Sequence, residues 1–276
     1  MLPSTARTST LIANLTSVRS TVAAAVSASS TPTKPVRLVA VSKLKPASDI
    51  LALHTQPAPP QLHFGENYVQ ELAAKAAALP PSVRWHFIGG LQSNKCKGLA
   101  EGVRGLWCVE SVDSGRKADG LEKGRRALAE RLRRDEGAPG PRDHLEPLRV
   151  MIQVNTSGEE QKAGVAPAET AALCAHVRDS CPHLRLQGLM TIGAIARSAA
   201  TTPETENEDL ALLKETRDKV AAELGLDKEE LELSMGMSAD YEAAIRMGSD
   251  EVRVGSTIFG ERPPKGEAKI FDESKG

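Results

Sequence analysis

The chain has 276 residues, of which 40% are hydrophobic and 26% are charged, and its formal net charge at pH 7 is -1. This is the composition of an ordinary globular protein, and the length allows one large α/β domain or two smaller ones. The near-zero charge provides no general attraction to nucleic acid or membrane, and no apolar run approaches the roughly 18 residues that span a bilayer, so we expect neither partner.

The first stretch of the chain allows two interpretations. Residues 1–48 contain no acidic side chain, and Arg7 and Arg19 stand among many Ser, Thr and Ala residues, as in a mitochondrial transit peptide. The alternative is an additional N-terminal helix, capped by Ser9 or Thr10. Apolar residues recur in it at spacings of three and four: Leu11, Leu15, Val18 and Val22. We favour the helix, because a transit peptide has no need of such a stripe.

After this segment, short apolar stretches alternate with helical patterns. Eight stretches are predicted as strands: Leu38–Ser42, Leu62–Glu66, Trp85–Gly89, Leu106–Glu110, Val150–Asn155, Leu186–Thr191, Leu231–Met235 and Val252–Gly255. Helical patterns between them include Tyr68–Ala78, Pro167–Ser180 and Asp209–Leu224. Sustained alternation predicts a single α/β domain over residues 1–276, folded as a (β/α)8 TIM-type barrel. A doubly wound open sheet is the alternative, but no glycine-rich turn follows the first strand.

Two segments break this rhythm. Residues 115–147 are densely charged and end in a Gly/Pro-rich stretch. Because acids and bases are interleaved there, we expect a charged insertion of solvated helix and loop rather than a patch that binds anions or RNA. Glu130 and Arg134 have the i, i+4 spacing of a helical ion pair. Residues 263–276 are polar and predict a loose tail.

The cysteines form neither a CxxC pair nor a Cys/His cluster of zinc-binding type. They are Cys96, Cys108, Cys174 and Cys181. This spacing indicates reduced thiols, no metal site and a reducing compartment. We therefore expect a cytoplasmic location, and the transit-peptide interpretation leaves a mitochondrial one as the alternative.

The first strand runs into two lysines. Functional side chains of such a barrel gather at the carboxyl ends of its strands. Val39, Val41 and Lys43 share one face of the strand, so Lys43 enters the mouth if the valines fill the barrel. An amine removed from water there can form a Schiff base with an aldehyde; a lysine that simply reaches solvent is the alternative. Lys45 has the same parity, but it precedes Pro46 and is expected in the following loop.

Glycines and hydroxyls follow the last two predicted strands, at residues 234–238 (SMGMS) and 254–257 (VGST). Barrels often bind phosphate at these two loops, so we expect a phosphate site rather than two ordinary turns. Arg253 lies beside the second loop, and an arginine inside a barrel needs an acceptor. A pyridine nitrogen would serve, and the permanent charge would keep it unprotonated. The alternative acceptor is a strand-end acid such as Glu66 or Glu110.

Six motifs resemble, in order, those of the pyridoxal-phosphate homeostasis proteins: AVSKLKP, FGENYVQE, WHFIGGLQSNK, GLMTIG, LSMGMSADYEAAI and VRVGSTIFGER. The stretch IANLTSVRSTV is similar to the family's first helix, and the likeness spans residues 12–262. The resemblance implies the fold of the N-terminal barrel of alanine racemase, with pyridoxal 5'-phosphate (PLP) as cofactor. The sequence departs from the family in the length and charge of residues 115–147. It also has Pro263 and Pro264 where the family has an aromatic residue.

The resemblance also implies roles for individual residues. Lys43 would form the Schiff base with PLP, and Arg253 would face the pyridine nitrogen. Asn67 would line the cofactor pocket, together with His86 and Met190. The phosphate would be held by Gly255, Ser256 and a further serine. Ser234 and Ser238 are the two alternatives for that direct contact.

We expect a protein that holds PLP without catalytic turnover, buffers the free aldehyde and passes it to PLP-dependent apo-enzymes. The alternative is an amino-acid racemase of the alanine racemase type, in which a tyrosine from a further domain and the partner subunit acts as second base. Here the chain ends soon after the eighth strand, and its two tyrosines, Tyr68 and Tyr241, lie in barrel motifs. We therefore expect no turnover and a monomer. A barrel that binds an anion without a covalent cofactor is the third alternative.

Overall fold

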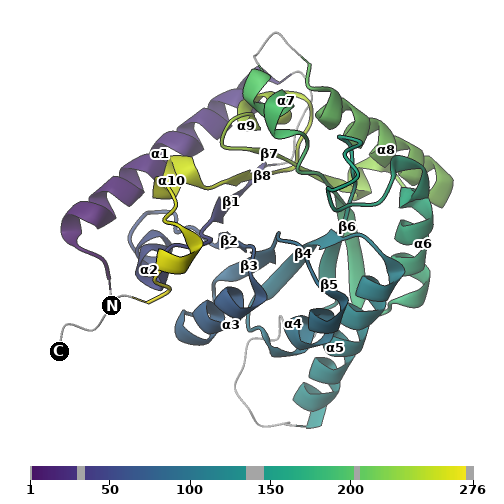
Figure 1. Cartoon of the computed structure of the whole chain (residues 1–276), viewed down its shortest axis with the longest axis horizontal. Helices are drawn as coiled ribbons and strands as arrows, with labels where there is room; N and C mark the ends of the chain where they lie inside the picture. The colour runs from purple at the N-terminus through teal and green to yellow at the C-terminus, as the bar shows by residue number, and fades with distance from the viewer. Residues whose placement is uncertain (1, 30–34, 135–145, 202–205, 272–276) are drawn as a thin grey trace.

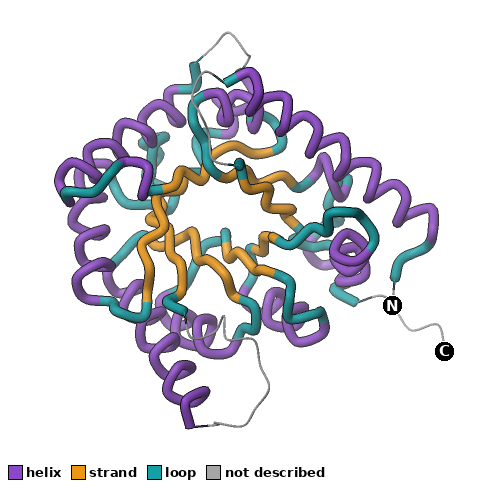
Figure 2. Tube along the Cα trace, turned by 180° about the vertical axis from the view of Figure 1, so that it is seen from behind, coloured by secondary structure: helices purple, strands orange, loops and turns teal. Residues whose placement is uncertain are grey.

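The computed structural model describes residues 2–29, 35–134, 146–201 and 206–271. Within them, eight parallel strands close into a barrel in sequence order (Figures 1 and 2). The strands are β1 (Arg37–Val41), β2 (His63–Glu66), β3 (Arg84–Phe87), β4 (Leu106–Val112), β5 (Leu148–Gln153), β6 (Leu184–Met190), β7 (Glu232–Met237) and β8 (Glu251–Val254). β1 closes the ring by pairing with β8, so that Val39 lies opposite Arg253. The predicted barrel and all eight strands are confirmed, with ends that differ by at most two residues.

Helices surround the ring of strands, as Figure 2 shows from behind. They are α1 (Thr5–Ala28), α2 (Ala47–Thr55), α3 (Val69–Ala78), α4 (Cys96–Gly102), α5 (Gly115–Arg134), α6 (Thr170–Ser180), α7 (Ile195–Ala200), α8 (Glu208–Leu224), α9 (Tyr241–Arg246) and α10 (Ser256–Phe259). The largest core cluster fills the layer between strands and helices and includes Phe64, Trp85 and Phe87. Burial of these apolar side chains is the main force that holds the helices on the barrel.

The additional N-terminal helix is present as α1, which lies along α2, α9 and α10 (Figure 1). The predicted apolar stripe is its buried face, and Arg7 adds an ion pair to the buried Asp49. The helix starts earlier than expected, because Ser4 accepts from the Arg7 amide and caps it in place of Ser9 or Thr10. By length and composition alone α1 could also cross a membrane, contrary to the expectation that no segment reaches that length.

The charged segment that begins at residue 115 differs from the predicted insertion. Its first part is α5, the helix that follows β4 in the barrel, and one face of it packs against α4. Leu121 and Ala118 are fully buried on that face, while Glu130 and Arg134 form the expected pair on the exposed one, at 3.8 Å. Because most side chains of α5 are charged, its narrow apolar stripe was not recognised in the sequence. Residues 135–145 lie outside the described residues.

The expected loose tail is attached in its first part. Residues Lys265–Glu267 form a short 3-10 helix, and the Ile270 carbonyl accepts a hydrogen bond of 2.8 Å from the Ala47 amide at the start of α2. Residues 272–276 lie outside the described residues.

The inside of the barrel is partly polar, whereas barrels of this type are commonly filled with branched aliphatic side chains. A small apolar cluster of Cys108, Met151 and Met190 occupies one part of it. The rest holds fully or almost fully buried ionisable groups on alternate positions of several strands: His86, Glu110, Glu251 and Arg253. Such groups are costly to bury unless they are paired, so their partners decide what the interior can do.

Candidate cofactor site at the carboxyl end of the barrel

Lys43 follows β1 by two residues and is half-buried at the carboxyl end of the barrel. Burial lowers the pKa of its ammonium group, and the positive charge of Arg262 lowers it further. Among the described residues, the Lys43 amine has neither a hydrogen-bond nor an ion-pair partner. Lys45 differs, since its amine donates a hydrogen bond to the Glu261 carbonyl. Lys43 is therefore the lysine of this pair whose amine remains available for chemistry.

A buried ion triad behind Lys43 holds the backbone that carries it. Lys75 on α3 is fully buried and contacts Glu66 at 2.7 Å and Glu71 at 2.6 Å. Its amine also donates to the Ser42 carbonyl at 2.9 Å, and Glu71 accepts a hydrogen bond of 2.7 Å from the Leu44 amide. The residues on both sides of Lys43 are thus fixed by one cluster. Leu44 is held at φ 61°, a left-handed conformation that a residue with a side chain seldom adopts without such support.

Two buried oxygens near this triad have no hydrogen-bond partner among the described residues. They are the second carboxylate oxygen of Glu66 and the side-chain oxygen of Asn67. Burial is the main cause that raises the pKa of Glu66. The backbone of Asn67 is packed so closely against the segment that follows β3 that a Cβ on Gly89 would lie 2.1 Å from its carbonyl oxygen. Asn67 is therefore placed by a contact that requires glycine at position 89.

Arg253 lies inside the barrel and is almost fully buried. It donates to the Ser234 hydroxyl at 2.5 Å and to the Thr191 carbonyl at 2.7 Å. Its distance to the Glu110 carboxylate is 3.7 Å, so the strand-end acid weighed from the sequence does accompany it. The guanidinium is fixed on one side by these acceptors and keeps its permanent charge.

The two serines expected near the phosphate occupy different environments. Ser234 is fully buried and belongs to the interior network, where it contacts Glu110 at 2.7 Å and Glu251 at 3.0 Å. Ser238 lies in the loop after β7, and its hydroxyl accepts from the Gly255 amide at 3.2 Å. Ser256 follows directly and is exposed. The structure thus brings Ser238, Gly255 and Ser256 together and separates Ser234 from them.

Gly255 sits where a side chain has no room. A Cβ there would lie 2.9 Å from the Arg262 guanidinium and 3.3 Å from Val41. The same contacts place Gly255 beside Val41, at the carboxyl ends of β8 and β1.

His86 and Met190 are both fully buried inside the barrel. His86 contacts His63 at 2.8 Å and Glu110 at 2.7 Å, and burial is the main cause that lowers its pKa to about 4. Met190 packs with Cys108 and Met151. Their assignment as lining of the cofactor pocket stays a prediction.

A chain of hydrogen bonds runs through the interior from one end of the barrel to the other. It starts at His63, passes through His86 and Glu110 to Ser234, and ends at Arg253. Glu251 joins it at Ser234, and burial followed by the charge of Glu110 raises the pKa of Glu251 to about 7. Glu110 was noted from the sequence only as a strand-end acid. Glu251 lies two residues before Arg253 on β8 and therefore on the same face of the strand, so the sequence could have placed this second carboxylate inside the barrel.

Comparison with known proteins places the chain among relatives. Residues 14–263 match the family model of the alanine racemase N-terminal domain. The pyridoxal phosphate homeostasis protein of Schizosaccharomyces pombe is 45% identical over 228 residues, which cover 83% of this chain and 85% of that protein. The human protein of the same name is 42% identical over 231 residues, with 82% and 76% covered.

A solved structure of PipY from Synechococcus elongatus, with PLP bound, is 32% identical to this chain. Its TM-score is 0.63, and the match covers 91% of this chain and 100% of PipY. The predicted resemblance is confirmed by these matches: the chain belongs to the family of alanine racemase N-terminal domains and, within it, to the pyridoxal phosphate homeostasis proteins.

Proposed function

We propose that this protein holds PLP as a Schiff base on Lys43 and serves as a reservoir of the cofactor without catalytic turnover. The observation that carries the proposal is the Lys43 amine, which is half-buried, has a lowered pKa and lacks a partner among the described residues, while Lys45 is engaged. The names of its relatives and the PLP in PipY support the same role.

The residues at the carboxyl end fit the chemical groups of PLP. An aldehyde matches the free amine of Lys43, and a phosphate matches the hydroxyls and amides of Ser238, Gly255 and Ser256. The buried side-chain oxygen of Asn67 still lacks a partner, as expected of a group that awaits a ligand. Arg253 offers a donor to a pyridine nitrogen. Ser234 would act on the cofactor through Arg253, rather than on the phosphate.

The lowered pKa of Lys43 favours its neutral amine, which is the nucleophile that adds to an aldehyde. PLP, when bound, would supply the aldehyde with which the Lys43 amine condenses, and one water molecule would be released. The buried triad keeps the amine pointing to the mouth by fixing Ser42 and Leu44 on both sides. The reaction is reversible in water, so the same lysine can both capture and release the aldehyde.

Arg253 supports the proposal of storage without turnover. When bound, PLP supplies an electron sink for amino-acid chemistry, and the sink is strongest when the ring nitrogen is protonated. A guanidinium cannot give up its proton in a protein, so beside Arg253 the nitrogen stays unprotonated. This weakens the sink and favours storage over racemisation.

The test is the visible absorbance of the purified protein with added PLP, before and after borohydride reduction. The unmodified chain and Lys45→Ala should show the imine band, and mass spectrometry of the reduced protein should locate the adduct on residue 43. Lys43→Ala should lose both signals. A band that survives in Lys43→Ala and disappears in Lys45→Ala would show that the wrong lysine was chosen.

Racemase activity is the alternative outcome. Steady conversion of an L-amino acid to its D-form by the PLP-loaded protein, lost in Lys43→Ala, would overturn the claim of storage without turnover. Transfer of PLP to an apo-enzyme, a cytoplasmic location and a monomeric state belong to the same proposal. They are tested by reactivation of a PLP-free enzyme, by cell fractionation and by light scattering.

A further inference from the structure

Three side chains that can bind a metal meet in the layer of helices, between α5 and α6, which lie next to each other (Figure 1). Asp119 belongs to α5, His176 belongs to α6, and Cys181 directly follows α6. One ligand atom of each lies within 4.8 Å of the ligand atoms of the other two. We propose that these three side chains bind one divalent transition-metal ion, of which Zn²⁺ is the type.

The separation of the ligand atoms suits such an ion. The distance from His176 Nε2 to Asp119 Oδ1 is 2.8 Å. Zn²⁺ lies about 2.0–2.3 Å from its nitrogen, oxygen and sulfur ligands, so these ligands are roughly 3–4 Å from one another. The side chains of His176 and Asp119 are 35% and 49% exposed, so they are free to adjust and an ion reaches them from solvent. A thiolate with an imidazole selects Zn²⁺ over Mg²⁺ or Ca²⁺, which prefer oxygen ligands.

Cys181 is the ligand that the fold holds most firmly. Its amide donates to the Val177 carbonyl at 3.2 Å, and its carbonyl accepts a hydrogen bond of 2.9 Å from the Leu184 amide at the start of β6. The side chain is 1% exposed, yet its thiol makes no hydrogen bond to any of the described residues. Such a thiol binds a metal ion as the thiolate and releases its proton to water.

The charges around the thiol favour a cation. Burial, followed by the charges of Glu122 and Asp119, raises the pKa of the Cys181 thiol to about 11. These two carboxylates disfavour a bare thiolate, but they attract a metal ion, and the charge of the ion then stabilises the thiolate. With Asp119 and Cys181 both ionised, the ligands themselves neutralise an ion of charge +2.

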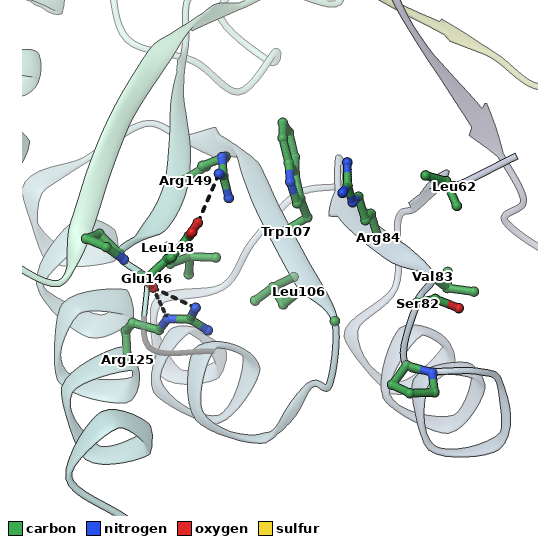
Figure 3. A pocket seen from close by; sticks show the side chains of 13 residues that line it. Leu62, Ser82, Val83, Arg84, Leu106, Trp107, Arg125, Glu146, Leu148 and Arg149 are labelled. Carbon is green, nitrogen blue, oxygen red and sulfur yellow. Dashed lines mark hydrogen bonds and ion pairs between the residues drawn. The ribbon is translucent and has the colours of Figure 1, made fainter. Parts of the chain in front are cut away.

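A second acid–histidine pair fixes the frame around the three ligands. Glu122, one turn after Asp119 on α5, accepts a hydrogen bond of 2.8 Å from the His183 amide and contacts the His183 ring at 2.7 Å. On the same helix, Arg125 donates to the Glu146 carbonyl at 2.7 and 3.1 Å (Figure 3). Both contacts fasten α5 to the chain just before β5 and β6. The ion therefore does not have to bring α5 and α6 together.

A second group of metal-binding side chains is less suitable. His86, Cys108 and Glu110 also have ligand atoms within 4.8 Å of one another, but they lie inside the barrel. There the Arg253 guanidinium is 3.7 Å from the Glu110 carboxylate, and the charge of Arg37 also acts on His86. These cations oppose the binding of a metal ion. The group between α5 and α6 is therefore the better candidate.

The competing explanation is that Asp119 and His176 form a surface ion pair and that Cys181 only fills the core beside them. The sequence favours this explanation, since the spacing of the cysteines predicts no metal site and Asp119 is 57 residues from His176. The test is a titration of the full chain, without a histidine tag, with Co²⁺ as a spectroscopic substitute for Zn²⁺. A tetrahedral cobalt–thiolate site gives d–d bands in the red and a sulfur-to-metal charge-transfer band in the ultraviolet. Calorimetry measures the affinity for Zn²⁺ itself.

We expect one Zn²⁺ per chain, with a Kd of about 1 μM or tighter, and both kinds of cobalt band. Cys181→Ala and His176→Gln should each weaken the binding of Zn²⁺ about tenfold or more, since even the outer partners of a metal site contribute that much. Cys181→Ala should also abolish the charge-transfer band. Cys108→Ala, which removes the thiol of the group inside the barrel, is the matched control and should keep the affinity within about twofold.

Circular dichroism checks that each variant is folded. Because His176 is partly exposed, His176→Gln tests the proposal even if Cys181→Ala does not fold. Three results would overturn the inference: a Kd weaker than about 100 μM, a cobalt spectrum without the sulfur band, or an unchanged affinity in His176→Gln. Loss of binding in Cys108→Ala with binding retained in Cys181→Ala would also overturn it, because the ion would then lie inside the barrel.

Discussion

Lys75→Met tests whether the buried triad sets both the stability of the barrel and the reactivity of Lys43. The substitution keeps the length of the side chain but removes the ammonium group, which is 0% exposed and contacts two carboxylates. Glu66 and Glu71 would then face each other without a cation, and the Ser42 carbonyl would lose its donor. Removing one partner of a buried ion pair costs about 3–5 kcal/mol. That is a large part of the roughly 5–15 kcal/mol that stabilises a typical domain.

Urea denaturation followed by circular dichroism measures this loss. Lys97→Met is the matched control, since Lys97 is exposed on α4, and its change should stay within about 0.5 kcal/mol. A loss below about 1 kcal/mol in Lys75→Met would refute the reasoning, because it would mean that the triad is not desolvated as the structure has it.

The same variant should alter the pH at which PLP reacts. The charges of Glu66 and Glu71 raise the pKa of Lys43, against the burial that lowers it. Without Lys75 these carboxylates act on Lys43 uncompensated, so its ammonium form is favoured. The midpoint of imine formation should therefore move to higher pH in Lys75→Met. A midpoint that stays in place, or moves down, would limit the triad to a role in stability.

Further predictions concern the interior and the mouth. The pKa of Glu251 is raised from 4.5 to about 7 in the folded state, so its stabilising contribution is complete below pH 4.5 and is lost as pH rises through 7. Between pH 4.5 and 7 the free energy of unfolding should therefore fall less in Glu251→Gln than in the unmodified chain, by at most about 3 kcal/mol. Urea denaturation at a series of pH values measures this, and an equal fall in both proteins would contradict the prediction. Gly89→Ala should lower the free energy of unfolding by more than about 2 kcal/mol, because the new methyl group would clash with the Asn67 backbone. In the control Gly90→Ala the methyl group would have no atom within 4 Å, so its stability in thermal or urea unfolding should be nearly unchanged.

Local sequence patterns were sufficient for the fold. Buried strands give short apolar stretches, and the helices that cover them give amphipathic stretches. This alternation can be seen along the chain for nearly every strand and the helix that follows it. The exception was α5, whose buried residues are widely spaced among charged ones. Its mean composition indicates a solvated helix, and only its packing against α4 shows otherwise.

The site was predictable only in part. Alternation along the first strand directed Lys43 to the mouth, but Lys45 has the same parity, and its contact with the Glu261 carbonyl is made by a distant segment of the chain. Lys75 gave no usable signal, because a lysine four residues after Glu71 on a helix ordinarily forms a surface pair. Its burial follows from the way α3 packs on β2 and β3, which no local sequence pattern shows.

The hydroxyl of Ser234 has one hydrogen, yet it lies within hydrogen-bond distance of two carboxylates, Glu110 and Glu251, as well as of Arg253. Arg253 must donate, so the oxygen accepts there and can donate to only one of the two acids. The other acid satisfies the contact best by carrying a proton of its own, in agreement with the raised pKa of Glu251. The folded barrel therefore holds this proton up to a pH of about 7, whereas the unfolded chain loses it near pH 4.5. It stores that proton one serine away from the arginine beside which the cofactor is proposed to bind.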